Sequence, residues 1–107
     1  MFLKWFDTRA VDGLADKLVR ELLHRIPPGS IDAVGKKAVN KKIRTREVVL
    51  RDAAEFSRDH RLNVYKKARL ANRFKWALLE AGYAKDFVDE ISFELAAVMA
   101  TRKNVPK

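Results

Sequence analysis

The sequence of 107 residues contains no cysteine, three prolines and four glycines. Without cysteine the chain can form no disulfide, thiolate zinc site or cysteine nucleophile, which fits a reducing compartment. Four scattered glycines build no phosphate-cradling loop. No stretch approaches the eighteen or so apolar residues that a membrane span needs. We therefore expect a cytoplasmic protein with neither a secretory signal nor a transmembrane segment.

Residues with catalytic or metal-binding chemistry are also few. His24 and His60 are the only histidines, and no nucleophile motif accompanies either one. Glu21 and His24 have the spacing of one half of a dinuclear helical metal site, but such a site needs a second pair and further carboxylates. An ion pair between Glu21 and Arg25 is the simpler interpretation. We predict that the protein is not an enzyme and binds no metal or cofactor.

Apolar residues make up 48% of the chain and recur at helical spacing. No stretch alternates apolar and polar residues as a half-buried strand would. The length suits one domain over residues 1–107, with an apolar arm over 1–6 and a frayed tail over 102–107. The predicted fold class is all-α, a compact single-domain bundle of four or five helices.

The expected helices are placed by their caps and stops. The first begins at Asp7 and ends before Pro27, because the two prolines that follow one another there cannot donate backbone hydrogen bonds. Lys42 and Arg46 interrupt the apolar side of residues 37–60, which favours two helical pieces meeting near Thr45.

The third and fourth helices are predicted further along the chain. The third covers residues 62–81 and stops at Gly82. Its expected inner stripe consists of Val64, Ala68, Ala71, Phe74, Leu78 and Ala81. Asp86 with Asp89 resembles a capping box that opens the last helix, whose expected stripe is Val88, Ile91, Leu95 and Val98.

Positive charge is concentrated in the middle of the chain. Residues 1–35 carry five basic and five acidic groups, residues 36–75 carry fourteen and four, and residues 76–107 carry four and five. The net charges of the three segments are therefore 0, +10 and −1. The excess of +9 forms a local basic footprint rather than a uniformly basic surface.

The basic side chains fall on one face of each predicted helix. In the middle segment this face carries Lys37, Lys41, Arg44, Arg51 and Arg58. In the third helix it carries Lys66, Arg69 and Arg73, with Trp76 beside them. Side by side, the two faces would form one cationic surface suited to phosphate groups. Trp76 and Tyr65 either stack on unpaired bases or pack at the rim of the domain.

These observations lead to two hypotheses of different classes. The first is a helical module that binds DNA or RNA through its phosphate backbone, using a basic face in residues 36–75. The second is a protein-interaction or homodimeric domain, because the last helix carries apolar residues on a second side: Phe93, Ala97 and Ala100. An acidic protein would also suit the basic face, so sequence alone leaves both hypotheses open.

Overall fold

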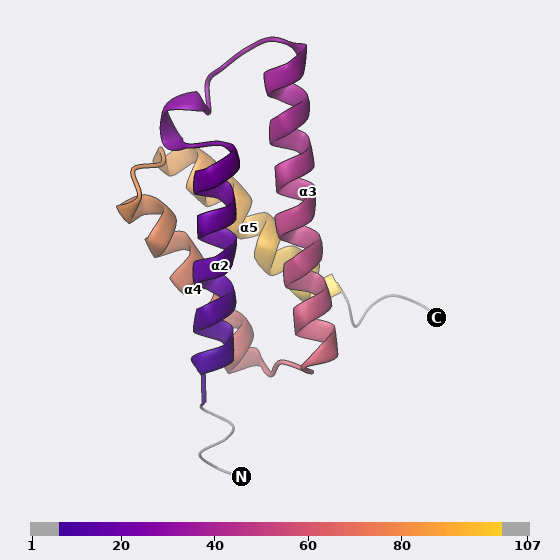
Figure 1. Ribbon diagram of the computed structural model, residues 1–107. Coiled ribbons are helices and arrows are strands. Elements are labelled where there is room, and N and C mark those ends of the chain that lie inside the picture. The colour runs from indigo at the N-terminus through magenta and orange to yellow at the C-terminus, as the bar shows by residue number, and fades with distance from the viewer. Residues whose placement is uncertain (1–6, 102–107) are drawn as a thin grey trace.

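The computed structural model describes residues 7–101 as four α-helices and one short 3₁₀ turn (Figure 1). Helix α2 (Arg9–Arg25) is followed by the turn η1 (Pro28–Ser30) and by helices α3 (Lys36–Asp59), α4 (Val64–Glu80) and α5 (Lys85–Thr101). Residues 7–101 contain no strand, and the prediction of a compact all-α bundle is confirmed, with four helices. The predicted arm over 1–6 and tail over 102–107 lie outside the described residues.

Each helix packs mainly against two others. Helix α2 contacts α3 and α4, and α5 contacts the same two helices. Figure 1 shows that α2 and α4 run in one direction and α3 in the other, while α5 crosses behind them obliquely. The core between the helices is formed mainly by Leu, Val and Ile, with two buried aromatic side chains, Phe74 and Tyr83. Within residues 7–101, no helix has the length and apolar character needed to cross a bilayer.

Helix α3 is continuous over Lys36–Asp59, so the prediction of two pieces meeting near Thr45 was wrong. Thr45 is buried, and its hydroxyl donates to the Lys41 carbonyl one turn earlier (2.8 Å) instead of capping a new helix. The two cations that seemed to interrupt the apolar side have partners at the edge of the bundle. Lys42 donates to the carbonyl oxygens of residues 31 and 33 (2.6 and 3.1 Å), and Arg46 binds Glu94 of α5.

The start of α2 also differs slightly from the prediction. The helix begins at Arg9, with Thr8 rather than Asp7 at the cap position. The Asp7 carboxylate nevertheless accepts a hydrogen bond from the backbone N–H of Arg9 (3.1 Å). This contact satisfies one of the free amides at the helix start, which is the role expected of Asp7.

The inner stripe of α4 is shifted from the prediction. Val64 is 79% exposed and Ala68 is exposed, whereas Leu70, Phe74 and Leu78 are fully buried. Both stripes have helical spacing, but burying Leu70 removes more apolar area from water than burying Ala68 does. Periodicity alone could not separate the two choices.

The capping box predicted at the start of α5 is absent. The helix begins at Lys85, so Asp86 lies within its first turn rather than at the cap. Asp89 instead accepts a hydrogen bond from the Lys85 ammonium (2.7 Å). In the core stripe of α5, Met99 is buried while the predicted Val98 is half-buried.

Helices α3 and α4 end with the same type of turn, but a different residue occupies the position of positive φ in each. At the end of α4, Gly82 has a φ of +103°, and the Tyr83 N–H donates to the Leu78 carbonyl (3.2 Å). At the end of α3, Arg61 has a φ of +50°, and the next N–H along the chain donates to the Ser57 carbonyl (3.1 Å). Both are Schellman turns, in which the left-handed position favours glycine. Gly82 therefore ends α4 as predicted. Arg61 ends α3 with a left-handed backbone conformation that is strained for a residue other than glycine.

Replacing Arg61 by glycine is expected to raise the free energy of unfolding by about 0.5–1 kcal/mol. Relief of the left-handed strain outweighs the extra freedom that glycine gives the unfolded chain. Urea denaturation monitored by circular dichroism measures the change. The matched control, Arg58→Gly, removes the same side chain within the last turn of the helix and should lower stability by about 1 kcal/mol. Equal losses in both variants would contradict the expected relief of strain.

Candidate nucleic-acid interface

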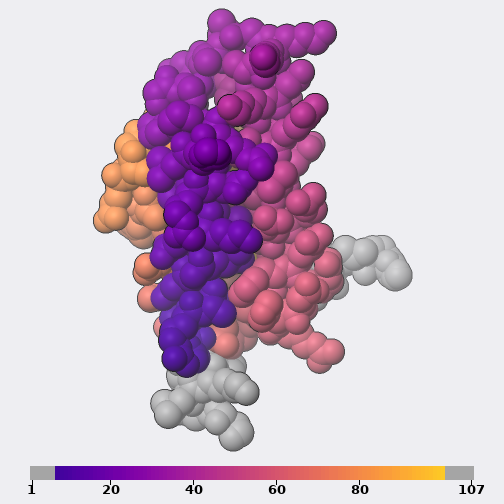
Figure 2. All heavy atoms as spheres, viewed as in Figure 1, coloured from indigo at the N-terminus to yellow at the C-terminus, as the bar shows by residue number. Residues whose placement is uncertain are grey.

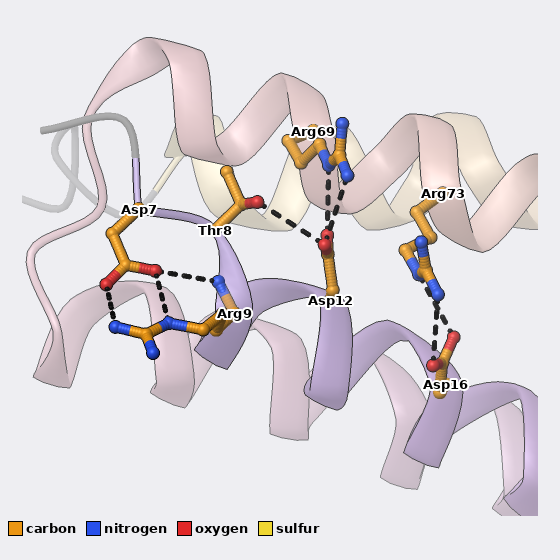
Figure 3. A network of polar contacts seen from close by, with 7 residues as sticks. All are labelled: Asp7, Thr8, Arg9, Asp12, Asp16, Arg69 and Arg73. Atoms are coloured by element: carbon orange, nitrogen blue, oxygen red, sulfur yellow. Dashed lines mark hydrogen bonds and ion pairs between the residues drawn. The ribbon is translucent and has the colours of Figure 1, made fainter. Parts of the chain in front are cut away.

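Two of the predicted site residues on α4 form ion pairs with α2 (Figure 3). The Arg69 guanidinium donates from Nε and Nη2 to the two carboxylate oxygens of Asp12 (2.9 and 3.0 Å). One turn along, Arg73 binds Asp16 in the same way (3.1 and 3.2 Å). Each pair is a bidentate fork, the geometry that best matches guanidinium to carboxylate. Arg69 and Arg73 share one face of α4 as predicted, and that face turns toward acids of a neighbouring helix.

The two ion pairs reflect the register of two parallel helices. In each pair the arginine follows its aspartate by 57 residues. A third contact has the same offset, because the buried hydroxyl of Tyr83 donates to the Ile26 carbonyl (2.8 Å). Burial raises the pKa of Tyr83 to about 12, so the hydroxyl keeps its proton at neutral pH. These contacts align α2 with α4 and with the turn that follows it.

The carboxylates at this end of α2 are held in the charged form. The hydrogen bond from Arg69 lowers the pKa of Asp12, and burial opposes that shift only in part. A hydrogen bond from Arg9 likewise lowers the pKa of Asp7. The charge of Arg69 is therefore offset by the Asp12 carboxylate at neutral pH.

The predicted basic face of α3 divides into two parts. In the second half of the helix, Arg51 lies 3.5 Å from the neighbouring Asp52, and Arg58 lies 3.6 Å from Asp59. Both arginines are exposed, but each is next to an acid. The first half differs, since it carries basic side chains and no acid in its first turn.

A groove runs between the first half of α3 and the end of α2. Three predicted site residues line it from α3, namely Lys37, Lys41 and Arg44. His24 and Arg25 line it from α2. Asn40 and Thr45 complete the lining, and the groove has a volume of about 660 Å³. Figure 2 shows α2 and α3 side by side on the face of the molecule turned toward the viewer. The groove is therefore basic on both walls.

The cations of this groove on α3 have no acidic partners nearby. Among residues 7–101, no carboxylate lies within 4.0 Å of the charged nitrogens of Lys37, Lys41 or Arg44. On the α2 wall, Arg25 binds Glu21 (2.6 Å), the pair that the sequence indicated. The backbone N–H groups in the first turn of α3 have no acceptor within the helix. They add partial positive charge at the same end of the bundle. An anion entering the groove therefore meets positive charge that the fold leaves uncompensated.

The α2 wall of the groove was missed by the sequence analysis. The available signal was the helix stop at Pro27 and Pro28, after which residues 26–35 connect α2 to α3. Consecutive helices of a bundle commonly pack as antiparallel neighbours. The last turn of α2 then lies near the first turns of α3, and His24 and Lys41 line the same groove.

The chain matches no family model, no curated protein and no solved structure.

The remaining predicted site residues lie outside the groove. Lys66 is half-buried at the start of α4, where its backbone N–H donates to the capping side chain of Asn63 (2.8 Å). Trp76 is 60% exposed on the same helix. On α5, Phe93 is 73% exposed, Ala97 is half-buried and Ala100 is exposed. The second apolar side expected for the last helix is thus an outer surface in this chain.

Residues 7–101 contain no group of three or more His, Asp or Glu side chains placed to hold a metal ion. Glu21 and His24, the pair with metal-site spacing, have different surroundings. Glu21 binds Arg25, and His24 lines the groove. The site geometry therefore offers binding by charge and hydrogen bonding among the described residues.

Proposed function

We propose that the protein binds nucleic acid through the sugar-phosphate backbone, with the groove between α2 and α3 as the principal contact. The single observation that carries this proposal is the absence of carboxylates near Lys37, Lys41 and Arg44 within residues 7–101. The four arginines elsewhere on the predicted basic face each lie within 4.0 Å of a carboxylate: Arg51, Arg58, Arg69 and Arg73. Binding a polyanion would release its condensed counterions, which supplies the driving force.

The groove residues suit phosphate oxygens in distinct ways. The Arg44 guanidinium can bind two oxygens of one phosphate, whereas the lysine ammonium groups act as mobile point charges. Asn40, between them on the same wall, offers a neutral donor and acceptor. None of these groups distinguishes one base from another, so we expect binding without sequence preference.

The test is a salt titration with generic duplex and single-stranded oligonucleotides, measured by fluorescence anisotropy. We expect a Kd on the order of micromolar or weaker at low salt. Three phosphate contacts predict a slope of log K against log salt of about −3 on duplex DNA and about −2 on single strands. Duplex affinity should then fall about 40-fold between 50 and 200 mM salt. No binding at low salt, or binding that salt does not weaken, would remove the proposal.

A second candidate function is self-association through α5. The observation that favours it is the exposure of Phe93, because large apolar side chains at the surface often mark an interface. Ala97 and Ala100 would let a partner helix approach closely along the same side. Sedimentation of the protein at high concentration separates the two candidates, since a persistent monomer would remove self-association and leave nucleic-acid binding standing.

A further inference from the structure

An exposed tryptophan lies on the outer face of α4. Tyr65, Asn72 and Trp76 follow one another at helical spacing and line an open depression of about 590 Å³. Trp76 is 60% exposed and Tyr65 is 39% exposed. Two flat rings therefore border one concave surface, on a helix adjacent to the α2 wall of the groove.

The exposure of Trp76 is not required by the packing of the bundle. Phe74 and Leu78, on either side of it in the sequence, are fully buried and close the core beneath α4. An indole left in water forgoes a large apolar burial, so most tryptophans are at least partly covered. Trp76 is therefore available to a ligand that supplies an apolar surface of its own.

The depression also has two guanidinium groups in fixed positions, although nearby carboxylates offset their charge. Arg69 and Arg73 line it, and their bidentate contacts with Asp12 and Asp16 hold both guanidinium groups in place. The Lys75 ammonium lies 5.8 Å from the centre of the Trp76 ring. Asp16 and Glu80 also line the depression, so its charge is mixed. A ligand with flat rings and separate anionic groups fits such a surface better than a plain polyanion does.

Exposed polar side chains of α2 lie, in the sequence, between the residue that lines this depression and the residue that lines the groove. Lys17, Arg20 and His24 follow one another at steps of three and four on α2, and all three are exposed. His24 at the end of this row lines the groove, and Asp16, which directly precedes Lys17 in the sequence, lines the depression. A strand of nucleic acid could thus cross α2 and contact both sites.

We propose that Trp76 is a stacking site for an unpaired base, and that the ligand of this protein is single-stranded nucleic acid. In a duplex the bases stack on one another at about 3.4 Å and present only their edges, so none offers a face to the indole. Tyr65 and Trp76 are eleven residues apart, about 16 Å along the helix, which is far longer than one stacked step. The two rings would therefore contact separate bases of one strand. This inference rests on the proposed function.

The test compares a short oligothymidine with a duplex of equal length, using a Trp5→Phe background in which Trp76 is the sole tryptophan. Oligothymidine should quench the fluorescence of Trp76 saturably, at the concentrations at which anisotropy reports binding. Trp76→Ala should weaken oligothymidine binding about 10-fold and leave duplex binding unchanged, because stacking contributes only with unpaired bases. Trp76→Phe should retain most of the affinity. The control Phe93→Ala removes an exposed ring outside the depression and should change neither affinity.

The outcomes separate this inference from the proposed function. If salt-dependent binding is present but Trp76→Ala weakens neither ligand, or both equally, the stacking site is wrong and the basic groove stands. If the protein binds neither oligonucleotide at low salt, both proposals fall together. Circular dichroism of each variant verifies that a lost affinity does not reflect a lost fold.

Discussion

A variant in which Lys41 and Arg44 are both replaced by glutamate is expected to bind oligonucleotides about 100-fold more weakly at low salt than the unmodified protein. Two of the three groove cations on α3 without nearby carboxylates become anions, so attraction to phosphate is replaced by repulsion. The dependence on salt should flatten as well, by about one unit of slope for each contact removed. Because both side chains are exposed, the melting temperature should change little.

The matched control replaces Arg9 and Lys85 by glutamate, which alters the net charge by the same amount. Both residues are exposed, lie outside the groove and form only surface ion pairs, whose loss has little effect on stability. This control should lose only the small affinity that any added negative charge removes. Equal losses in the two double variants would mean that overall charge, and not the groove, determines binding.

Arg69 and Arg73 are less suitable for this experiment, although the sequence singled them out. Reversing their charge would place glutamates against Asp12 and Asp16, the carboxylates that now bind them. Repulsion between α2 and α4 would then weaken the fold together with any ligand contact. A lost affinity in that variant would have two explanations.

Phe74→Ala is expected to lower the free energy of unfolding by about 3–5 kcal/mol. Phe74 is fully buried at the centre of α4, between Leu70 and Leu78 on the same stripe. The substitution loses the free energy of burying the ring. It also leaves a cavity, because the helices around it are packed against one another and can move inward only in part. Since domains of this size are stable by only about 5–15 kcal/mol, the variant should unfold at much lower urea concentration.

Urea denaturation monitored by circular dichroism measures this loss. Phe93→Ala serves as the control, because Phe93 is 73% exposed and its removal should change stability by about 0.5 kcal/mol or less. Equal effects of the two substitutions would contradict the placement of Phe74 in the core.

The helical fold could be predicted because its determinants are local. The two prolines after Ile26 and the glycine at position 82 end helices in ways that depend on a few neighbouring residues. The unbroken helix α3 could not be predicted, since Lys42 and Arg46 find their partners outside their own helix. Only the folded bundle brings Glu94 to Arg46.

The candidate site likewise has a part that could be predicted from local spacing and a part that could not. Helical spacing correctly placed Lys37, Lys41 and Arg44 together, because they lie on one helix. Spacing within a helix could not show that Arg69 and Arg73 are offset by acids 57 residues earlier in the chain. Charge counted along the sequence therefore overstates the free positive charge on α4.

Nuclear magnetic resonance of the isotope-labelled protein titrated with oligothymidine tests nucleic-acid binding at the groove most directly. We expect the largest chemical-shift changes at backbone amides of residues 24–25 and 37–45, which form the two walls of the groove. These changes should saturate with the ligand and reverse as salt is added, because phosphate contacts weaken with ionic strength. Shifts confined to the surface of α5 around Phe93, or no shifts at low salt, would contradict the assignment of the groove as the binding site.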